Sequence, residues 1–193
     1  MTILTISTAA PDCGGGVYSG GFSATANDLF FGSPTADGYG ISWMPFTVPL
    51  KKDSKINSVT LKVVASISTS SGNVKCSMGF CGVDNVTNPA SFADLQGASG
   101  TMTTARYTES TNMASYVAGT EYSYDLTNSF KEVNSRTLWV AGNRMAIVID
   151  GAGSSNDLAR WFASYENSTY TEARIEIDYT PELTGLLNPM WFM

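Results

Sequence analysis

Two runs of alternating side chains within residues 56–82 constrain the fold of this chain more than any other feature. Apolar residues take every second position from 59 to 67 and again from 74 to 80, and Thr-Ser-Ser-Gly-Asn occupies 69–73. Period-2 alternation on both sides of a polar turn predicts a β-hairpin with one buried face. The residues expected on that face are Val59, Leu61, Val63, Val74, Met78 and Phe80.

Shorter alternating segments recur through the rest of the sequence. Residues 145–150 are apolar on both faces, which predicts a central strand. Residues 173–179 place Ala, Ile, Ile and Tyr on one face and charged residues on the other, which predicts a half-buried strand. Pro45 and Pro49 lack a backbone donor, so the strand predicted at 41–50 is expected at an edge or a bulge.

One short helix is predicted among these strands. Leu126, Phe130 and Val133 fall at helical spacing, and Asp125 or Thr127 supplies the cap. Many short strands joined by turns rich in Gly and Asn are typical of packed antiparallel sheets. The expected fold class is therefore all-β: an antiparallel, jelly-roll-like β-sandwich of about eight or nine strands with one short helix.

The chain suits one domain with an extension at each end. Residues 25–180 are expected to form the β-sandwich domain. Residues 1–24 are expected to be an N-terminal arm or loop, in which the segment Ile3–Ile6 predicts either a short first strand or an ordered arm. Residues 181–193 follow as an apolar C-terminal tail.

The C-terminal tail is the most unusual segment, because after Pro181 only Glu182 is charged. Apolar side chains at this density are an aggregation hazard in water, so a cover is expected. The tail either docks onto another chain or folds back over its own sandwich. Burial of Trp191 and Phe192 would stabilise either contact by about 2–3 kcal/mol each. The residues expected to dock are Leu183, Leu186, Leu187, Met190, Trp191, Phe192 and Met193.

Composition argues against several classes of function. The sequence contains no histidine, which removes the commonest general acid–base group and the imidazole metal ligands. A net charge of −6 argues against nucleic acid as a partner. No stretch approaches the ~18 apolar residues of a membrane span. Three cysteines are too few for a structural zinc site built from thiolates alone, and Cys76 and Cys81, five apart on one strand, are expected on opposite faces as free thiols.

Aromatic and acidic side chains offer two candidate chemical sites. The tyrosines either form a sugar-stacking platform or pack across strands. Those in question are Tyr18, Tyr39, Tyr107, Tyr116 and Tyr170. Glycoside hydrolysis needs two paired carboxylates, and no motif selects a pair here, so solvated charges and no enzyme activity are expected. The acids in question are Glu109, Glu121, Glu132, Glu166 and Glu172.

One loop is rich in oxygen ligands. Residues 150–157 read Asp-Gly-Ala-Gly-Ser-Ser-Asn-Asp, which either hold calcium or form a hairpin turn between two strands. The spacing is not that of a calcium-binding hand. The turn explains the composition fully, so no metal and no cofactor is expected.

Several segments carry a family resemblance. Residues 43–50 read Trp-Met-Pro-Phe-Thr-Val-Pro-Leu and residues 56–63 read Ile-Asn-Ser-Val-Thr-Leu-Lys-Val. Asp-Leu-Thr at 125–127, Phe-Ala-Ser-Tyr-Glu at 162–166 and Ile-Glu-Ile-Asp-Tyr at 175–179 follow. In these motifs almost the whole chain resembles the DNRLRE, or carbohydrate-binding-like, β-sandwich modules, which implies a jelly-roll-like sandwich. As a free-standing sandwich of this size, the chain also resembles decoration (cement) proteins of tailed-phage capsids.

The expected function is structural: a virion protein of a tailed phage, most simply a decoration protein on the capsid exterior. Its expected partners are the major capsid protein or another virion protein, with a homo-oligomer such as a trimer fitting local symmetry axes. The segment Met1–Thr8 lacks the features of a signal peptide, which agrees with assembly into a particle. The alternative is a carbohydrate-binding module, lectin-like or receptor-binding, whose partner is a glycan.

Overall fold

The computed structural model describes residues 2–8, 13–17, 21–36 and 38–181. Over these residues the chain is an all-β sandwich of antiparallel sheets, so the predicted fold class is confirmed. This part of the chain forms twelve strands and two helices, more than the eight or nine strands and one helix expected. The strands are β1 (Thr2–Ser7), β2 (Gly14–Val17), β3 (Phe22–Ser23), β4 (Asp28–Ser33), β5 (Gly40–Thr47), β6 (Lys55–Val64), β7 (Cys76–Phe80), β8 (Tyr107–Glu109), β9 (Glu121–Asp125), β10 (Arg144–Asp150), β11 (Leu158–Ala163) and β12 (Arg174–Thr180). The helices are α1 (Phe92–Gly100) and α2 (Thr127–Asn134).

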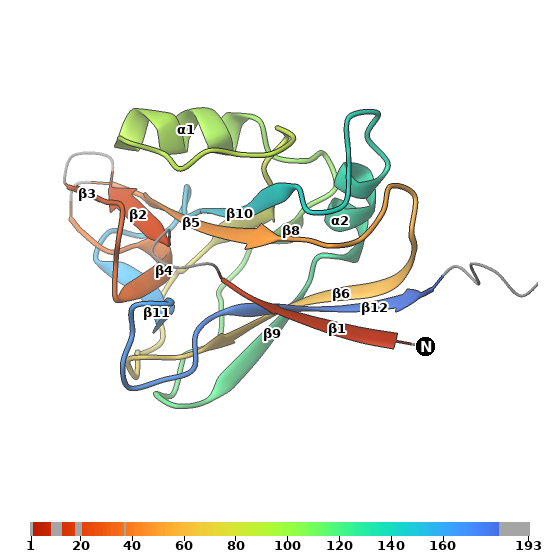
Figure 1. The fold of residues 1–193 in the computed structure, drawn as a ribbon. Coiled ribbons are helices and arrows are strands. Elements are labelled where there is room, and N and C mark those ends of the chain that lie inside the picture. The colour runs from red at the N-terminus through yellow and green to blue at the C-terminus, as the bar shows by residue number, and fades with distance from the viewer. Residues whose placement is uncertain (1, 9–12, 18–20, 37, 182–193) are drawn as a thin grey trace, which may run out of the picture.

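Two sheets face each other across the molecule (Figure 1). The first has four strands in the order β1-β12-β6-β9, and the second has six in the order β3-β2-β5-β10-β7-β8. A ribbon of β11 and β4 lies at one end of the sandwich, and α2 lies at the other. α1 covers the outer face of the six-stranded sheet and adds a third layer.

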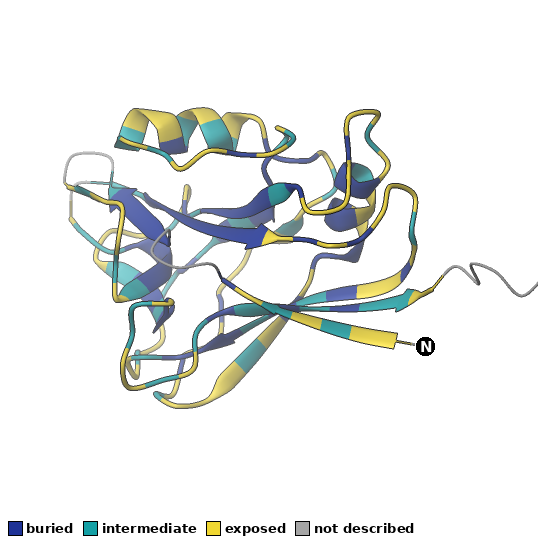
Figure 2. Ribbon diagram, in the orientation of Figure 1, coloured by how far each residue is buried: buried dark blue, intermediate teal, exposed yellow. Residues whose placement is uncertain are grey.

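The main core fills the space between the two sheets, where the facing sides of the strands are buried (Figure 2). The six side chains predicted on the buried face at 56–82 all have no exposed surface and belong to this core. β12 alternates as predicted, because Ile175 and Ile177 are buried while Arg174 and Glu176 are partly exposed. The direction of each side chain therefore followed from period-2 alternation.

The predicted hairpin at 56–82, in contrast, is wrong. β6 pairs with β12 and β9 in one sheet, whereas β7 pairs with β10 and β8 in the other. The connection crosses between the sheets and bonds to other loops: Thr69 N donates to Tyr116 O at 2.9 Å, and Val74 N donates to Asn112 Oδ1 at 3.1 Å. Alternation specifies which face of a strand is buried. It does not specify the partner, because both sheets bury one apolar face in the same core.

A smaller core lies between α1 and the outer face of the six-stranded sheet. The N-cap residue of α1 is Ser91, whose Oγ accepts from Asp94 N at 3.2 Å. Cys81 belongs to this core and Cys76 to the main core, so the two thiols lie on opposite faces as their spacing predicted. All three cysteines are buried, and Cys76 and Cys81 are free thiols, as expected. The buried members of the smaller core are Ile41, Trp43, Cys81, Val86, Leu95, Met102, Ala146 and Val148.

The strand positions agree with most local predictions. β10 is central between β5 and β7, as expected for 145–150. β5 is an interior strand, with β10 on one side and β2 on the other. β2 pairs with β5 only as far as Trp43, so beyond that point the β2 side of β5, where Pro45 lies, is locally open. Residues 2–7 form strand β1, which pairs with β12. Of the two alternatives expected near the N-terminus, the short first strand is therefore the one observed.

The short helix predicted near residue 130 is α2. Asp125 Oδ1 accepts from Thr127 N at 2.9 Å at its start, and Phe130 and Val133 are buried in the main core. α1 is the second helix. Neither helix of the described residues is long and apolar enough to cross a membrane.

Candidate docking surface

The predicted docking tail begins at Pro181, at one end of the sandwich. β12 ends at Thr180, beside the first residue of β6. A hollow of ≈ 230 Å³ opens there, lined by Pro49, Leu50, Lys51, Ser54, Tyr179, Thr180 and Pro181. The residues predicted to dock lie outside the described residues: Leu183, Leu186, Leu187, Met190, Trp191, Phe192 and Met193.

A loop packed against this hollow exposes two large apolar side chains. Trp139 is only 2% exposed, and its Nε1 donates to Leu50 O at 3.0 Å, which anchors the loop to the rim of the hollow. Its sequence neighbours Leu138 and Val140 are 74% and 60% exposed on either side of the buried indole. We call Leu138, Val140 and the residues that line the hollow the exit surface.

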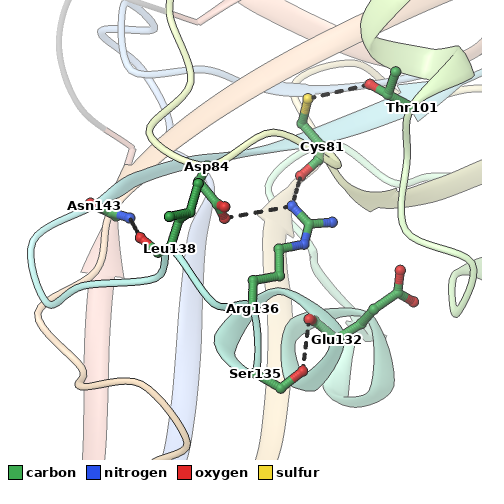
Figure 3. Close-up of polar contacts among 8 residues, drawn as sticks. All are labelled: Cys81, Asp84, Thr101, Glu132, Ser135, Arg136, Leu138 and Asn143. Atoms are coloured by element: carbon green, nitrogen blue, oxygen red, sulfur yellow. Dashed lines mark hydrogen bonds and ion pairs between the residues drawn. The ribbon is translucent and has the colours of Figure 1, made fainter.

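Polar contacts brace this loop (Figure 3). Asn143 Nδ2 donates to Leu138 O at 3.4 Å and closes the loop on itself. Arg136, just after α2, donates from Nη1 to Cys81 O at 3.5 Å and lies 3.8 Å from Asp84 Oδ1. A braced backbone loses less conformational entropy when a partner binds, so the exposed side chains are presented in a form suited to docking.

Burial of these side chains would be favourable. Single exposed apolar residues are normal on protein surfaces. Leu138 and Val140 differ because they share one loop, which Trp139 anchors to Leu50 in the lining of the hollow at Pro181. Full burial against a partner would stabilise the contact by about 1.5–3 kcal/mol for each side chain. Sequence reasoning missed both residues, because the run Leu-Trp-Val has no periodicity that tells which side chain points inward.

Four tyrosines from β8, β9 and the segment between these strands pack together. Tyr116 is buried, its ring lies 4.0 Å from that of Tyr122 in a stacked geometry, and its hydroxyl bonds with that of Tyr124. Tyr107 meets Tyr124 edge-on at 5.3 Å. Burial raises the pKa of Tyr116, so its hydroxyl stays neutral. For these residues the cross-strand packing alternative describes the geometry, and Tyr18 lies outside the described residues.

Two of the candidate carboxylates, Glu121 and Glu132, have structural partners. Arg174 Nη2 lies 2.6 Å from Glu121, and Lys62 Nζ lies 3.5 Å from it. The hydrogen bond from Arg174 lowers the pKa of Glu121. Glu132 accepts from the backbone amides of 104–105, both at 3.0 Å. Within the described ranges no three His, Cys, Asp or Glu side chains gather in a group that fits a metal ion.

The oxygen-rich loop at 150–157 joins two different sheets, so it is not the hairpin turn expected as one alternative. β10 lies in the six-stranded sheet, whereas β11 lies in the ribbon. Ser154 Oγ donates to Lys75 O at 2.8 Å and accepts from Lys75 N at 2.9 Å, and Asp150 Oδ1 accepts from Ala152 N at 2.9 Å. The Ser154 contacts fasten the loop to Lys75, and the Asp150 contact closes a turn within the loop.

A second hollow of ≈ 560 Å³ lies between α1 and the loop at 83–89. Trp43 and Cys81 form its buried base, and a Cβ added at Gly97 of α1 would meet no atom within 4 Å. The indole Nε1 of Trp43 has no hydrogen-bond partner among the described residues. Apolar and polar atoms line this hollow in similar measure. The hollow was not predicted from the sequence, because it arises from the placement of α1 on the sheet.

No protein-family model matches the chain, and no curated protein matches its sequence.

Proposed function

We propose that this protein is a structural virion component of a tailed phage, a decoration protein that binds the capsid exterior. The proposed partner is the major capsid protein or another virion protein. The observation that carries the proposal is the exit surface, where Leu138 and Val140 are exposed on a braced loop. Trp139 anchors this loop to Leu50, which lines the same hollow as Pro181 at the start of the apolar C-terminal tail. Surfaces of this kind are typical of protein–protein contacts.

The mechanism would be passive binding. The tail and the two exposed side chains would be withdrawn from water together against the capsid, so the contact would gain mainly from apolar burial. Contacts of this type depend weakly on salt, because they rely little on charge pairs at the rim. The sandwich would act as the rigid support that holds the exit surface and the tail.

Co-sedimentation with expanded capsids tests the proposal. The double variant Leu138→Ser, Val140→Ser is expected to lose binding, because both apolar contacts are removed while the fold keeps its anchor Trp139. The matched control is Ile67→Ser, Val117→Ser, which removes exposed apolar side chains near the far end of β6 and is expected to bind like the wild type. Failure of the wild type to bind capsids, or equal binding by the first variant, would refute the proposal.

Removal of residues 183–193 separates docking from self-packing. Docking predicts an isolated protein of unchanged thermal stability that no longer binds capsids. A loss of thermal stability in the isolated protein would instead place the tail against its own sandwich.

Glycan binding is a second candidate, favoured by one hollow of ≈ 340 Å³ at the ribbon. Phe30 and Trp161 meet there with ring centroids 5.3 Å apart, next to the carboxylate of Asp28, which accepts from Asn167 Nδ2 at 2.9 Å. An aromatic face beside a hydrogen-bonding carboxylate is suited to a sugar ring. A glycan array with the wild type and Trp161→Ala tests this candidate, and absence of any binding by the wild type would reject it.

A further inference from the structure

The sheets of this molecule end in edge strands, which differ in how well they are protected from pairing with another chain. The four-stranded sheet ends in β1 and β9, the six-stranded sheet ends in β3 and β8, and the ribbon has β4 and β11. An edge strand presents unpaired backbone donors and acceptors, and natural proteins protect such edges by shortness, charge or cover. The six edges of the described residues can therefore be compared.

Three of these edges are protected by length or charge. β3 has two residues and β8 has three, too few for extended pairing with another chain. β9 has five residues and carries Glu121 and Asp125 at its ends. Glu121 also holds Arg174 and Lys62 in an ion-pair network at that edge.

The two strands of the ribbon are covered by neighbouring segments. Ser42 Oγ accepts from Phe30 N at 3.0 Å and donates to Phe30 O at 2.9 Å, which occupies both backbone groups in the middle of β4. Ser66 N donates to Trp161 O at 3.2 Å along β11. Side chains and loops thus complete hydrogen bonds that a foreign strand would need.

β1 has none of these protections among the described residues. It is six residues long and reads Thr-Ile-Leu-Thr-Ile-Ser, with no charge, proline or glycine. It pairs with β12 on one side, and its other side faces no described strand. Ile3 is 63% exposed. A strand of high β-propensity and no charge, open along one edge, is a template for pairing with another chain.

We propose that β1 pairs antiparallel with β1 of a second copy of this chain, joining two four-stranded sheets into one of eight strands. In this arrangement a two-fold axis runs perpendicular to the joined sheet. The core-facing side chains of both copies lie on the same face of that sheet only if one residue of β1 lies opposite the same residue of the second copy. Placing the axis at Thr5 sets Leu4 opposite Ile6 of the partner subunit. Both side chains pack partly buried against the main core, so this register continues the apolar face across the interface.

The second copy fits this edge better than the C-terminal tail of another chain. The tail is interrupted by Gly185 and Pro189, so no run of five residues in it is free of both. Pro lacks the donor that a strand ladder needs, and Gly weakens a strand. β1 is uncharged, so two copies meet without like-charge repulsion. The pairing is independent of the proposed function, because it would occur in the purified protein.

Sedimentation velocity over a range of protein concentrations tests the pairing. The wild type is expected to form a dimer. Thr5→Lys places two lysines opposite each other at the axis and is expected to weaken the dimer by roughly tenfold or more. Ser123→Lys adds the same charge to the exposed edge strand β9 and is expected to leave the dimer unchanged. A mixture of Thr5→Lys and Thr5→Glu chains is expected to restore association through the opposite charges.

Cross-linking tests the register independently of these charges. Opposed residues of an antiparallel pair have Cα atoms about 4.5–5.5 Å apart, within disulfide reach. Thr5→Cys is therefore expected to form a covalent dimer on mild oxidation. Ile3→Cys is the control, because Ile3 lies opposite Ser7 of the partner subunit and its two copies are too far apart. A wild type that stays monomeric at every concentration, or efficient cross-linking by Ile3→Cys and not by Thr5→Cys, would overturn the proposal.

Discussion

Arg160 on β11 supports a sharp prediction about stability. Its side chain is 1% exposed, and its donors bond to backbone carbonyls. Nε donates to Ala114 O at 2.8 Å, and Nη2 donates to Met113 O at 2.9 Å and to Gly72 O at 3.3 Å. No acidic side chain lies within ion-pair distance of it in the described part of the chain. The guanidinium therefore ties two crossing loops to the ribbon through their backbones.

Arg160→Met removes these bonds and keeps most of the volume of the side chain. Each buried carbonyl left without a donor costs about 1–3 kcal/mol. The two shortest bonds, to Ala114 and Met113, therefore set a loss of about 2–6 kcal/mol. The desolvation cost of the buried cation is relieved at the same time, which trims the upper end. We expect the variant to lose about 2–5 kcal/mol of unfolding free energy.

Urea unfolding, followed by circular dichroism, measures this loss from the midpoint and slope. Arg174→Met is the matched control, because it removes the same cation from a partly exposed pair with Glu121. Exposed pairs contribute little, so a loss below about 1 kcal/mol is expected there. The reasoning is refuted if Arg160→Met is within about 1 kcal/mol of the wild type, or if both variants lose the same amount.

Three further predictions follow from single contacts. Gly97→Ala is expected to stabilise the protein by about 0.5–1 kcal/mol in thermal unfolding, because its Cβ meets open space on α1, whereas Gly151→Ala is expected to destabilise it because the Cβ would strike the backbone of β4. Burial raises the pKa of Cys76 to about 12, so a thiol reagent at mild alkaline pH is expected to react with it only after denaturation, and rapid reaction of the folded protein would contradict this. Arg174 lowers the pKa of Glu121 in the folded state. At pH values above the ordinary pKa of a glutamate this carboxylate therefore stabilises the fold, and this contribution is lost as the pH falls through the lowered pKa. The stability difference between the wild type and Glu121→Gln in urea is therefore expected to be present at neutral pH and to shrink as the solution is acidified below the ordinary pKa of a glutamate, and a difference that grows on acidification would contradict it.

The candidate surfaces show where sequence reasoning stops. The tail is conspicuous because its apolar density is visible without a structure, and it lies outside the described residues. Leu138 and Val140 were not predicted, because their exposure depends on Trp139 reaching Leu50 from another part of the chain. Arg160 lies on β11, and burial of its cation cannot be inferred from alternation because the carbonyls that accept from it come from distant loops.

The sequence alone determined the fold class and the inward face of most strands. Val59, Leu61 and Ile175 point into the core because successive side chains of a strand alternate, which is a local property of the backbone. The tertiary structure alone decided the partners: β6 and β7 lie in different sheets, and β1 is left as the open edge. Pairing joins segments far apart in the chain and depends on the packing of all strands together, so no local pattern specifies it.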